Sequence, residues 1–166
     1  MSKTIVLNSK QIEQKINRLA HQVYENNYEE SEIIVAGIAT RGYILAQRIA
    51  KVLKSISPMK VQVGEIKINK NTPLSDAIEF PITDDELKNK VIFLVDDVIN
   101  SGRTLIYAVR YFLRVRVKKL RTIVLVDRRH NIFPVRADYV GISLSTTLQE
   151  HVSVDLGKGK EAVYLS

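Results

Sequence analysis

Two adjacent carboxylates, Asp96 and Asp97, follow the apolar run 91–95 and precede the loop Asn-Ser-Gly-Arg-Thr at 100–104. A continuous aliphatic run is typical of a buried parallel strand, which presents ligands where the chain turns toward a helix. The loop offers backbone amides, two hydroxyls and a guanidinium just before a helical pattern that starts at Leu105, a combination that suits an anion. An acid pair beside an anion cradle predicts a site for a phosphorylated polyol.

A second loop bracketed by glycines, residues 37–42, has the same setting. It follows the apolar run 33–38 and precedes a helical pattern over 43–54. A Gly-x-x-x-x-Gly spacing has little specificity alone, but Thr40 and Arg41 add a hydroxyl and a cation. Two such strand, loop and helix units indicate that both loops lie at one edge of a sheet.

The remaining pattern alternates strands and helices and predicts an α/β fold with a central, mostly parallel sheet flanked by helices. Asn8 or Ser9 is suited to cap an N-terminal helix, and the stretch 69–89 is the one long irregular loop that we expect. The tail around Gly157–Lys160 predicts a C-terminal β-hairpin, because it lacks the Ser or Thr and the helix of a phosphate-binding P-loop. We see no boundary and expect a single domain, 1–166. The other expected strands cover 61–68, 122–127 and 139–142, and a further helical pattern covers 105–115.

Composition is that of an ordinary globular protein: 166 residues, 45% hydrophobic and 26% charged. The chain has no cysteine, which excludes a disulfide scaffold and thiolate metal sites. No apolar run approaches the length of a membrane span, and the first residues lack the apolar stretch of a secretion signal. We therefore expect a cytoplasmic protein with no membrane partner.

The acid-pair motif resembles the signature of the type I phosphoribosyltransferases, which use phosphoribosyl pyrophosphate (PRPP). Collinear matches at 17–21, 37–42, 63–66, 126–130 and 134–141 are similar to the PyrR-type subfamily, whose members regulate pyrimidine operons by binding RNA and are also uracil phosphoribosyltransferases. The resemblance implies a phosphoribosyltransferase (Rossmann-like) fold with a small hood, Mg²⁺ as cofactor, PRPP and a nucleobase or nucleotide as ligands, and a homodimer or higher homo-oligomer.

The resemblance also implies roles for individual residues. Asp96 and Asp97 would hold the ribose hydroxyls and contact Mg²⁺ indirectly, through those hydroxyls or water, and together with Arg41 they form the expected catalytic set. The pyrophosphate would lie on the first loop and the 5′-phosphate on the second, while the segment after the strand 122–127 would face the base. The complete set of expected substrate-binding residues is Thr40, Arg41, Gly42, Asp96, Asp97, Val98, Asn100, Ser101, Gly102, Arg103, Thr104, Asp127 and Arg128.

Two departures from the family pattern affect the expected activity. Asn100 stands where purine salvage members carry an aspartate, and because an amide is no general base at neutral pH, uracil becomes the favoured acceptor. The segment after Ile66 is shorter than in PyrR-type proteins and lacks the charged residues of their lid. Lys67 or Lys70 can replace an arginine's charge but not its forked geometry, so turnover is less secure than PRPP binding.

Two alternatives remain open at this stage. One is an RNA-binding regulator with weak or no transferase activity, supported by an excess of 25 Lys and Arg over 18 Asp and Glu and by Arg18, His21 and Arg136, which match the RNA face of the subfamily. Three residues weaken this match, because they differ from those usual in the subfamily: Asn17, Asn131 and Ile142. Arg18 and His21 are equally compatible with a solvated helix face. The other alternative is a PRPP or nucleotide sensor that has lost both activities.

Overall fold

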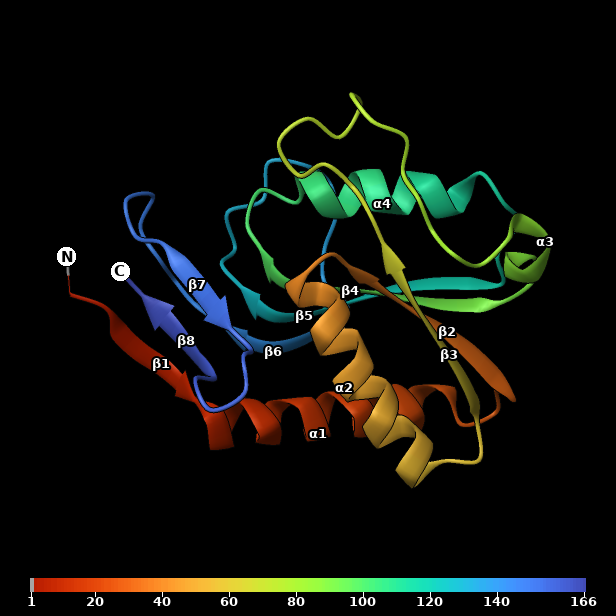
Figure 1. Ribbon diagram of the computed structural model, residues 1–166, viewed down its shortest axis with the longest axis horizontal. Coiled ribbons are helices and arrows are strands. Elements are labelled where there is room, and N and C mark those ends of the chain that lie inside the picture. The colour runs from red at the N-terminus through yellow and green to blue at the C-terminus, as the bar shows by residue number, and fades with distance from the viewer. Residues whose placement is uncertain (1) are drawn as a thin grey trace.

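Five parallel strands form the centre of the protein in the order β3-β2-β4-β5-β6 (Figure 1). The computed structural model describes residues 2–166. The central strand β4 is buried on both faces, which explains why its sequence is a continuous aliphatic run rather than an alternating one. The predicted α/β fold with a parallel sheet is confirmed. The five strands are β2 (Glu32–Ile38), β3 (Lys60–Ile66), β4 (Val91–Ile99), β5 (Lys119–Asp127) and β6 (Tyr139–Ser143).

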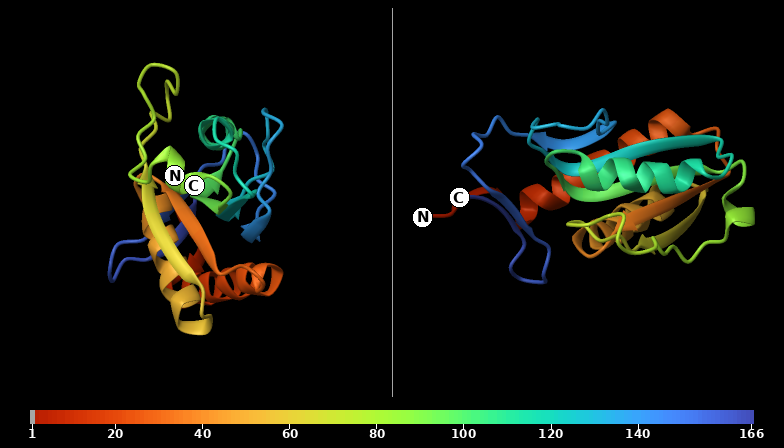
Figure 2. Two further views of the ribbon diagram at one scale, coloured as in Figure 1. Left: turned by 90° about the vertical axis from the view of Figure 1, so that its right-hand side faces the viewer. Right: turned by 90° about the horizontal axis from the view of Figure 1, so that it is seen from above.

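Helices cover both faces of this sheet, and each face has its own apolar core. The helices α1 (Ser9–Asn27) and α2 (Arg41–Ile56) lie on one side, and α4 (Arg103–Leu113) lies on the other (Figures 1 and 2). Within residues 2–166, no helix has both the length and the apolar character needed to cross a membrane. The loops 37–42 and 100–104 each join a strand to a helix, but the two helices, α2 and α4, lie on opposite faces.

A second sheet joins the first and last strands of the chain, so that Thr4 pairs with Leu165 (Figure 2). Strand β1 (Thr4–Asn8) pairs with β8 (Ala162–Leu165), which pairs with β7 (Val152–Asp155), all antiparallel. We call this three-stranded sheet the hood. The predicted C-terminal hairpin is confirmed, whereas β1 was not predicted, because its partner is at the opposite end of the sequence.

Element boundaries differ from the predictions mainly at helix starts. Asn8 caps α1 through a reciprocal capping box with Gln11, in which each side-chain oxygen accepts from the other residue's amide at 2.9 Å. Helix α4 begins at Arg103 rather than Leu105. The expected irregular stretch also contains order, since Lys67 pairs with Glu79 and a short helix, α3 (Asp84–Leu87), follows it. The segment between β3 and α3 projects beyond the sheet (Figure 2).

Candidate functional site

A cavity of about 350 Å³ opens at the carboxyl edge of the parallel sheet. Its walls come from β4 and the following loop, from the start of α2, from the projecting segment after β3, from β5 and from strand β7 of the hood with the residue before it. Five separate parts of the sequence therefore meet at one cavity. The lining residues are Arg41, Lys70, Asp96, Asp97, Val98, Ile99, Asn100, Ser101, Gly102, Arg103, Thr104, Leu105, Val124, His151, Val152 and Ser153.

The acid pair lies inside β4 rather than after it, because the strand continues to Ile99. Asp96 and Asp97 are only 5% and 3% exposed, so burial withdraws both carboxylates from water. Two cations compensate them. Arg41 Nε lies 2.8 Å from Asp97 Oδ2, and Lys70 Nζ lies 3.4 Å from Asp96 Oδ1 and 4.0 Å from Asp97 Oδ1. The acid pair and the two cations thus form one compact cluster at the cavity.

Burial is the main reason that the pKa of Asp96 is raised to about 8. The negative charge of Asp97 raises this pKa further, while the ammonium of Lys70 lowers it. Burial and the charge of Asp97 therefore both favour the protonated form of Asp96 in the free protein. A ligand that needs both carboxylates ionised must overcome this preference.

Gly42 allows the first loop to lie directly on the acid pair. A Cβ atom at this position would lie 2.7 Å from the carbonyl oxygen of Val95, closer than real Cβ contacts, and 3.1 Å from Asp96 Oδ1, tighter than most of them. Within residues 2–166, the N-cap residue Thr40 makes no side-chain hydrogen bond to the helix, so the first-turn amides of α2 remain free beside Arg41. The first loop thus combines free amides and a guanidinium next to the carboxylates, as an anionic ligand would require.

The second loop has a similar geometry at the start of α4. Gly102 is the N-cap, with φ of +84°, a conformation that favours glycine. The amide of Arg103 donates to Ser101 Oγ at 3.3 Å, and because Gly102 has no side chain to cap the helix, the following first-turn amides of α4 are open to a ligand. The carbonyl of Ser101 accepts from the amides of Ile132 and Phe133 at 2.8 and 3.0 Å, which fixes the loop against the segment that follows β5.

Asp127 and Arg128 lie behind the cavity wall rather than on it. Asp127 Oδ1 accepts from the amide of Arg129 at 2.8 Å. Arg128 is 8% exposed and its guanidinium donates to Asn100 Oδ1 at 2.8 Å, as well as to three oxygens of the segment 146–150. The structure therefore connects Arg128 to the cavity only through Asn100.

The hood contributes residues that the sequence did not indicate. His151, the residue directly before β7, and Ser153 of β7 line the cavity, although more than 45 residues separate them from the second loop along the chain. No local motif marks them, because their position depends on the pairing of β7 with β8. Lys70 was considered only as a substitute for a lid arginine, and the structure places its ammonium at the acid pair.

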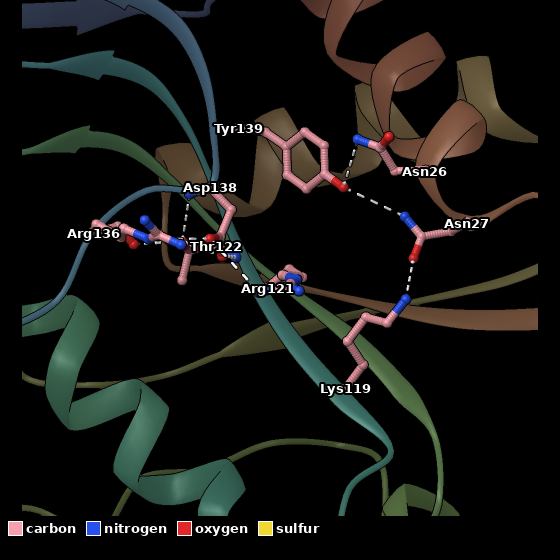
Figure 3. A network of polar contacts seen from close by, with 8 residues as sticks. All are labelled: Asn26, Asn27, Lys119, Arg121, Thr122, Arg136, Asp138 and Tyr139. Carbon is pink, nitrogen blue, oxygen red and sulfur yellow. Dashed lines mark hydrogen bonds and ion pairs between the residues drawn. The ribbon is translucent and has the colours of Figure 1, made fainter.

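The residues expected at an RNA face lie away from this cavity. Arg18 on α1 donates to the carbonyls of Val140 and Gly141, and His21 Nδ1 lies 2.8 Å from the carbonyl of Asn17. Arg136 differs, because its side chain is 85% exposed and only 3.6 Å from one carboxylate, that of Asp138. Figure 3 shows Arg136 and Asp138 near Arg121, at the edge formed by β5 and β6.

The acid pair can serve as part of a metal site but not as a complete one. Among residues 2–166, no three His, Cys, Asp or Glu side chains converge on a point. The protein's own hydrogen bonds use Asp96 Oδ1 and Asp97 Oδ2, so the other oxygen of each carboxylate keeps its lone pairs. Two hard oxygen donors plus oxygens of a bound substrate match the usual coordination of Mg²⁺.

Comparison with known proteins agrees with this geometry. The profile of the phosphoribosyl transferase domain matches residues 2–156. The chain belongs to the phosphoribosyltransferase family.

Its similar relatives carry the name bifunctional protein PyrR. The protein from Clostridium acetobutylicum is 37% identical over 161 residues, covering 93% of this chain and 90% of that protein. The protein from Macrococcus caseolyticus is 33% identical over 174 residues and covers 99% of both chains.

Solved structures share the fold at lower identity. The hypoxanthine phosphoribosyltransferase of Trypanosoma cruzi has a TM-score of 0.79 at 15% identity, covering 98% of this chain and 95% of that chain. The hypoxanthine-guanine phosphoribosyltransferase of Bacillus anthracis has a TM-score of 0.73 at 22% identity, covering 87% and 84%. These likenesses show the fold alone.

Proposed function

We propose that this protein transfers ribose 5-phosphate from PRPP to a nucleobase with Mg²⁺ as cofactor, that the acceptor is uracil, and that residues 1–166 act as one domain. The observation that carries the proposal is the acid pair lying between two loops with free helix amides. A ribose with a phosphate at one end and a pyrophosphate at the other needs this order of groups. Family membership and the PyrR relatives support the same reaction class.

In this proposal Asp96 and Asp97 orient the ribose by accepting hydrogen bonds from its 2′ and 3′ hydroxyls. The 5′-phosphate is bound by the loop 100–104, and the pyrophosphate by Thr40, Arg41 and the amide of Gly42. When bound, Mg²⁺ supplies positive charge to the pyrophosphate and the ribose oxygens. The buried carboxylates favour an oxocarbenium-like transition state, because positive charge develops next to them while the pyrophosphate leaves.

Lys70 gives the projecting segment a role in this proposal. Its ammonium lies beside the acid pair, and its residue belongs to the segment that would cover the bound PRPP. A flexible lysine is able to move from the carboxylates to the pyrophosphate as the substrate enters. The lid thus has at least one suitable charge despite its short length.

Uracil as the acceptor is supported by residue 100. An amide cannot take a proton from a purine ring nitrogen, so a base whose reaction does not require this proton acceptor is favoured. A pyrimidine acceptor agrees better with the relatives named bifunctional protein PyrR than with the hypoxanthine enzymes, because the latter share only the fold with this chain.

Pyrophosphate release from PRPP with Mg²⁺ tests the proposal. Uracil, cytosine, orotate, hypoxanthine and guanine are offered separately, and the Asp96→Asn, Asp97→Asn double variant serves as the blank. Release with uracil alone is the expected result. Release with another base alone contradicts the acceptor, and no release with any base contradicts the enzymatic function, in which case binding of PRPP or UMP would indicate a sensor.

A second candidate function is RNA binding, favoured by a basic groove at the start of β5 and β6. A cavity of about 280 Å³ lies between α1, β5 and the segment before β6, with Lys119, Arg121 and Arg136 on its walls. Lys119 bonds to Asn27 at 2.9 Å. Arg121 and Arg136 lie 3.9 and 3.6 Å from Asp138 Oδ1, but their side chains are 47% and 85% exposed and therefore accessible to phosphates (Figure 3).

The RNA candidate is tested by the salt dependence of RNA binding. Replacing Arg136 by Gln should weaken binding and reduce the salt slope by about one ion. Lys158→Gln, in the exposed turn of the hood, is the matched control for loss of one charge. Equal behaviour of both variants would exclude the groove as the RNA site.

A further inference from the structure

Arg128 is a buried cation whose hydrogen bonds organise two loops at the back of the cavity. Its guanidinium donates to Thr146 Oγ1 at 3.1 Å, to the carbonyl of Thr147 at 3.3 Å and to the carbonyl of Glu150 at 2.6 Å. A fourth bond, of 2.8 Å, goes to the side-chain oxygen of Asn100. The last bond is the one that reaches a residue of the cavity wall.

This bond fixes which end of the Asn100 amide faces the cavity. A guanidinium only donates hydrogen bonds, so the atom that Arg128 contacts must be the oxygen of the amide. The usual ambiguity between the oxygen and nitrogen of an asparagine is therefore removed by chemistry. Since Asn100 lines the cavity and its oxygen is engaged, its NH₂ group remains to serve a ligand.

The charged groups of the cavity match the charged and hydroxyl groups of the ligand, so Asn100 is expected to contact a neutral part of it. The acid pair matches the ribose hydroxyls, and the cations Arg41 and Lys70 match the pyrophosphate. The amides of the second loop match the 5′-phosphate. Asn100 is the first residue of that loop, directly after β4, and its side chain is uncharged and able to form hydrogen bonds. A nucleobase is the uncharged, hydrogen-bonding part of the proposed ligand, and this step rests on the proposed function.

We propose that Arg128 is a positioning residue that holds the Asn100 amide with its NH₂ group toward the base, so that the site selects a nucleobase presenting a carbonyl oxygen there. Uracil carries carbonyl oxygens at both of its exocyclic positions. A base with an amino group at the matched position would place donor against donor and leave both without a partner. Arg128 thereby determines specificity without touching the ligand.

The test compares equilibrium binding of UMP with that of ribose 5-phosphate, because the ratio of the two affinities isolates the contribution of the base. Asn100→Leu removes the donor, and Asn100→Asp replaces it by an oxygen that repels a carbonyl. We expect the ratio to fall by about 10- to 100-fold in both variants, and at least as far in the aspartate variant. Because Asn100 is exposed, both variants should fold.

Arg128 is tested by the same ratio together with thermal unfolding. Arg128→Met should lower the ratio toward that of Asn100→Leu, and Arg128→Lys, which keeps a donor and a charge, should restore part of it. A purely structural role would lower the unfolding temperature in both variants without moving the ratio. Gln149→Leu, an exposed position on the segment that Arg128 holds, is the control.

The outcomes separate this inference from the proposed function. Wild-type protein that binds neither UMP nor ribose 5-phosphate would overturn the proposed function and the inference with it. Wild-type binding of both, with an unchanged ratio in Asn100→Asp, would overturn only the orientation of the amide. A lowered ratio in the Asn100 variants and in Arg128→Met, partly restored by lysine, would support it.

Discussion

Replacing Asp96 by asparagine should flatten the dependence of the protein's stability on pH. Asp96 has a pKa of about 8 in the folded protein against 3.8 as the ordinary value, chiefly because it is buried. Between these two values the folded chain keeps a proton that the unfolded chain has released. Raising the pH through this window therefore favours unfolding.

The size of the effect follows from proton linkage. One extra proton on the folded state lowers the free energy of unfolding by about 1.4 kcal/mol for each pH unit inside the window. Asparagine has no proton to exchange, so this contribution disappears in the variant. Near neutral pH the asparagine variant should consequently gain stability relative to the wild type as the pH rises, and the two should become parallel above the folded pKa.

Urea unfolding of both proteins at about pH 5, 6 and 7 measures the difference in slope directly. Glu13→Gln, an exposed carboxylate on α1, provides a control in which only a surface charge is removed. Equal slopes for wild type and Asp96→Asn would refute the reasoning, because they would mean that Asp96 is ionised in the folded protein throughout this range.

Three further perturbations act on separate features. Gly42→Ala should destabilise the protein by about 1–3 kcal/mol and weaken PRPP binding, since its Cβ would lie 2.7 Å from the Val95 carbonyl; unchanged urea unfolding would contradict this. Lys70→Met should raise the pKa of Asp96 further, as followed by carboxyl ¹³C NMR, whereas the same change at Lys67 should leave it in place. Tyr139→Phe should cost about 0.5–1.5 kcal/mol in urea unfolding, because its hydroxyl accepts from Asn26 and Asn27 at 3.3 and 3.4 Å (Figure 3); no loss would show that these bonds are dispensable.

Most of the architecture could be predicted from local sequence patterns. The aliphatic run 91–95 predicts a strand buried on both faces, and β4 is such a strand, because only a central parallel strand needs apolar residues on both sides. The glycines at 42 and 102 mark the two loops for a similar reason, since one permits a close approach and the other a positive φ. These features act within a few residues of themselves and are therefore visible in the sequence.

Boundaries were less well predicted where the signal was short. The acid pair was expected after its strand, yet β4 includes it and continues to Ile99, because pairing with β5 extends to Asp127. Strand β1 was missed, since only one of its five residues, Leu7, is buried and no alternation marks it. Its existence depends on β8, which the sequence places more than 150 residues later.

The sequence by itself determined the fold class, the acid pair and the two candidate anion-binding loops, because each is encoded by contiguous residue types. Only the tertiary structure decided which distant groups act on them. It placed Lys70 beside Asp96, brought His151, next to the hood strand β7, to the cavity and buried Arg128 against Asn100. Charge and hydrogen-bonding effects depend on distance and burial in three dimensions, so the raised pKa of Asp96 and the orientation of Asn100 arise only when the chain is folded.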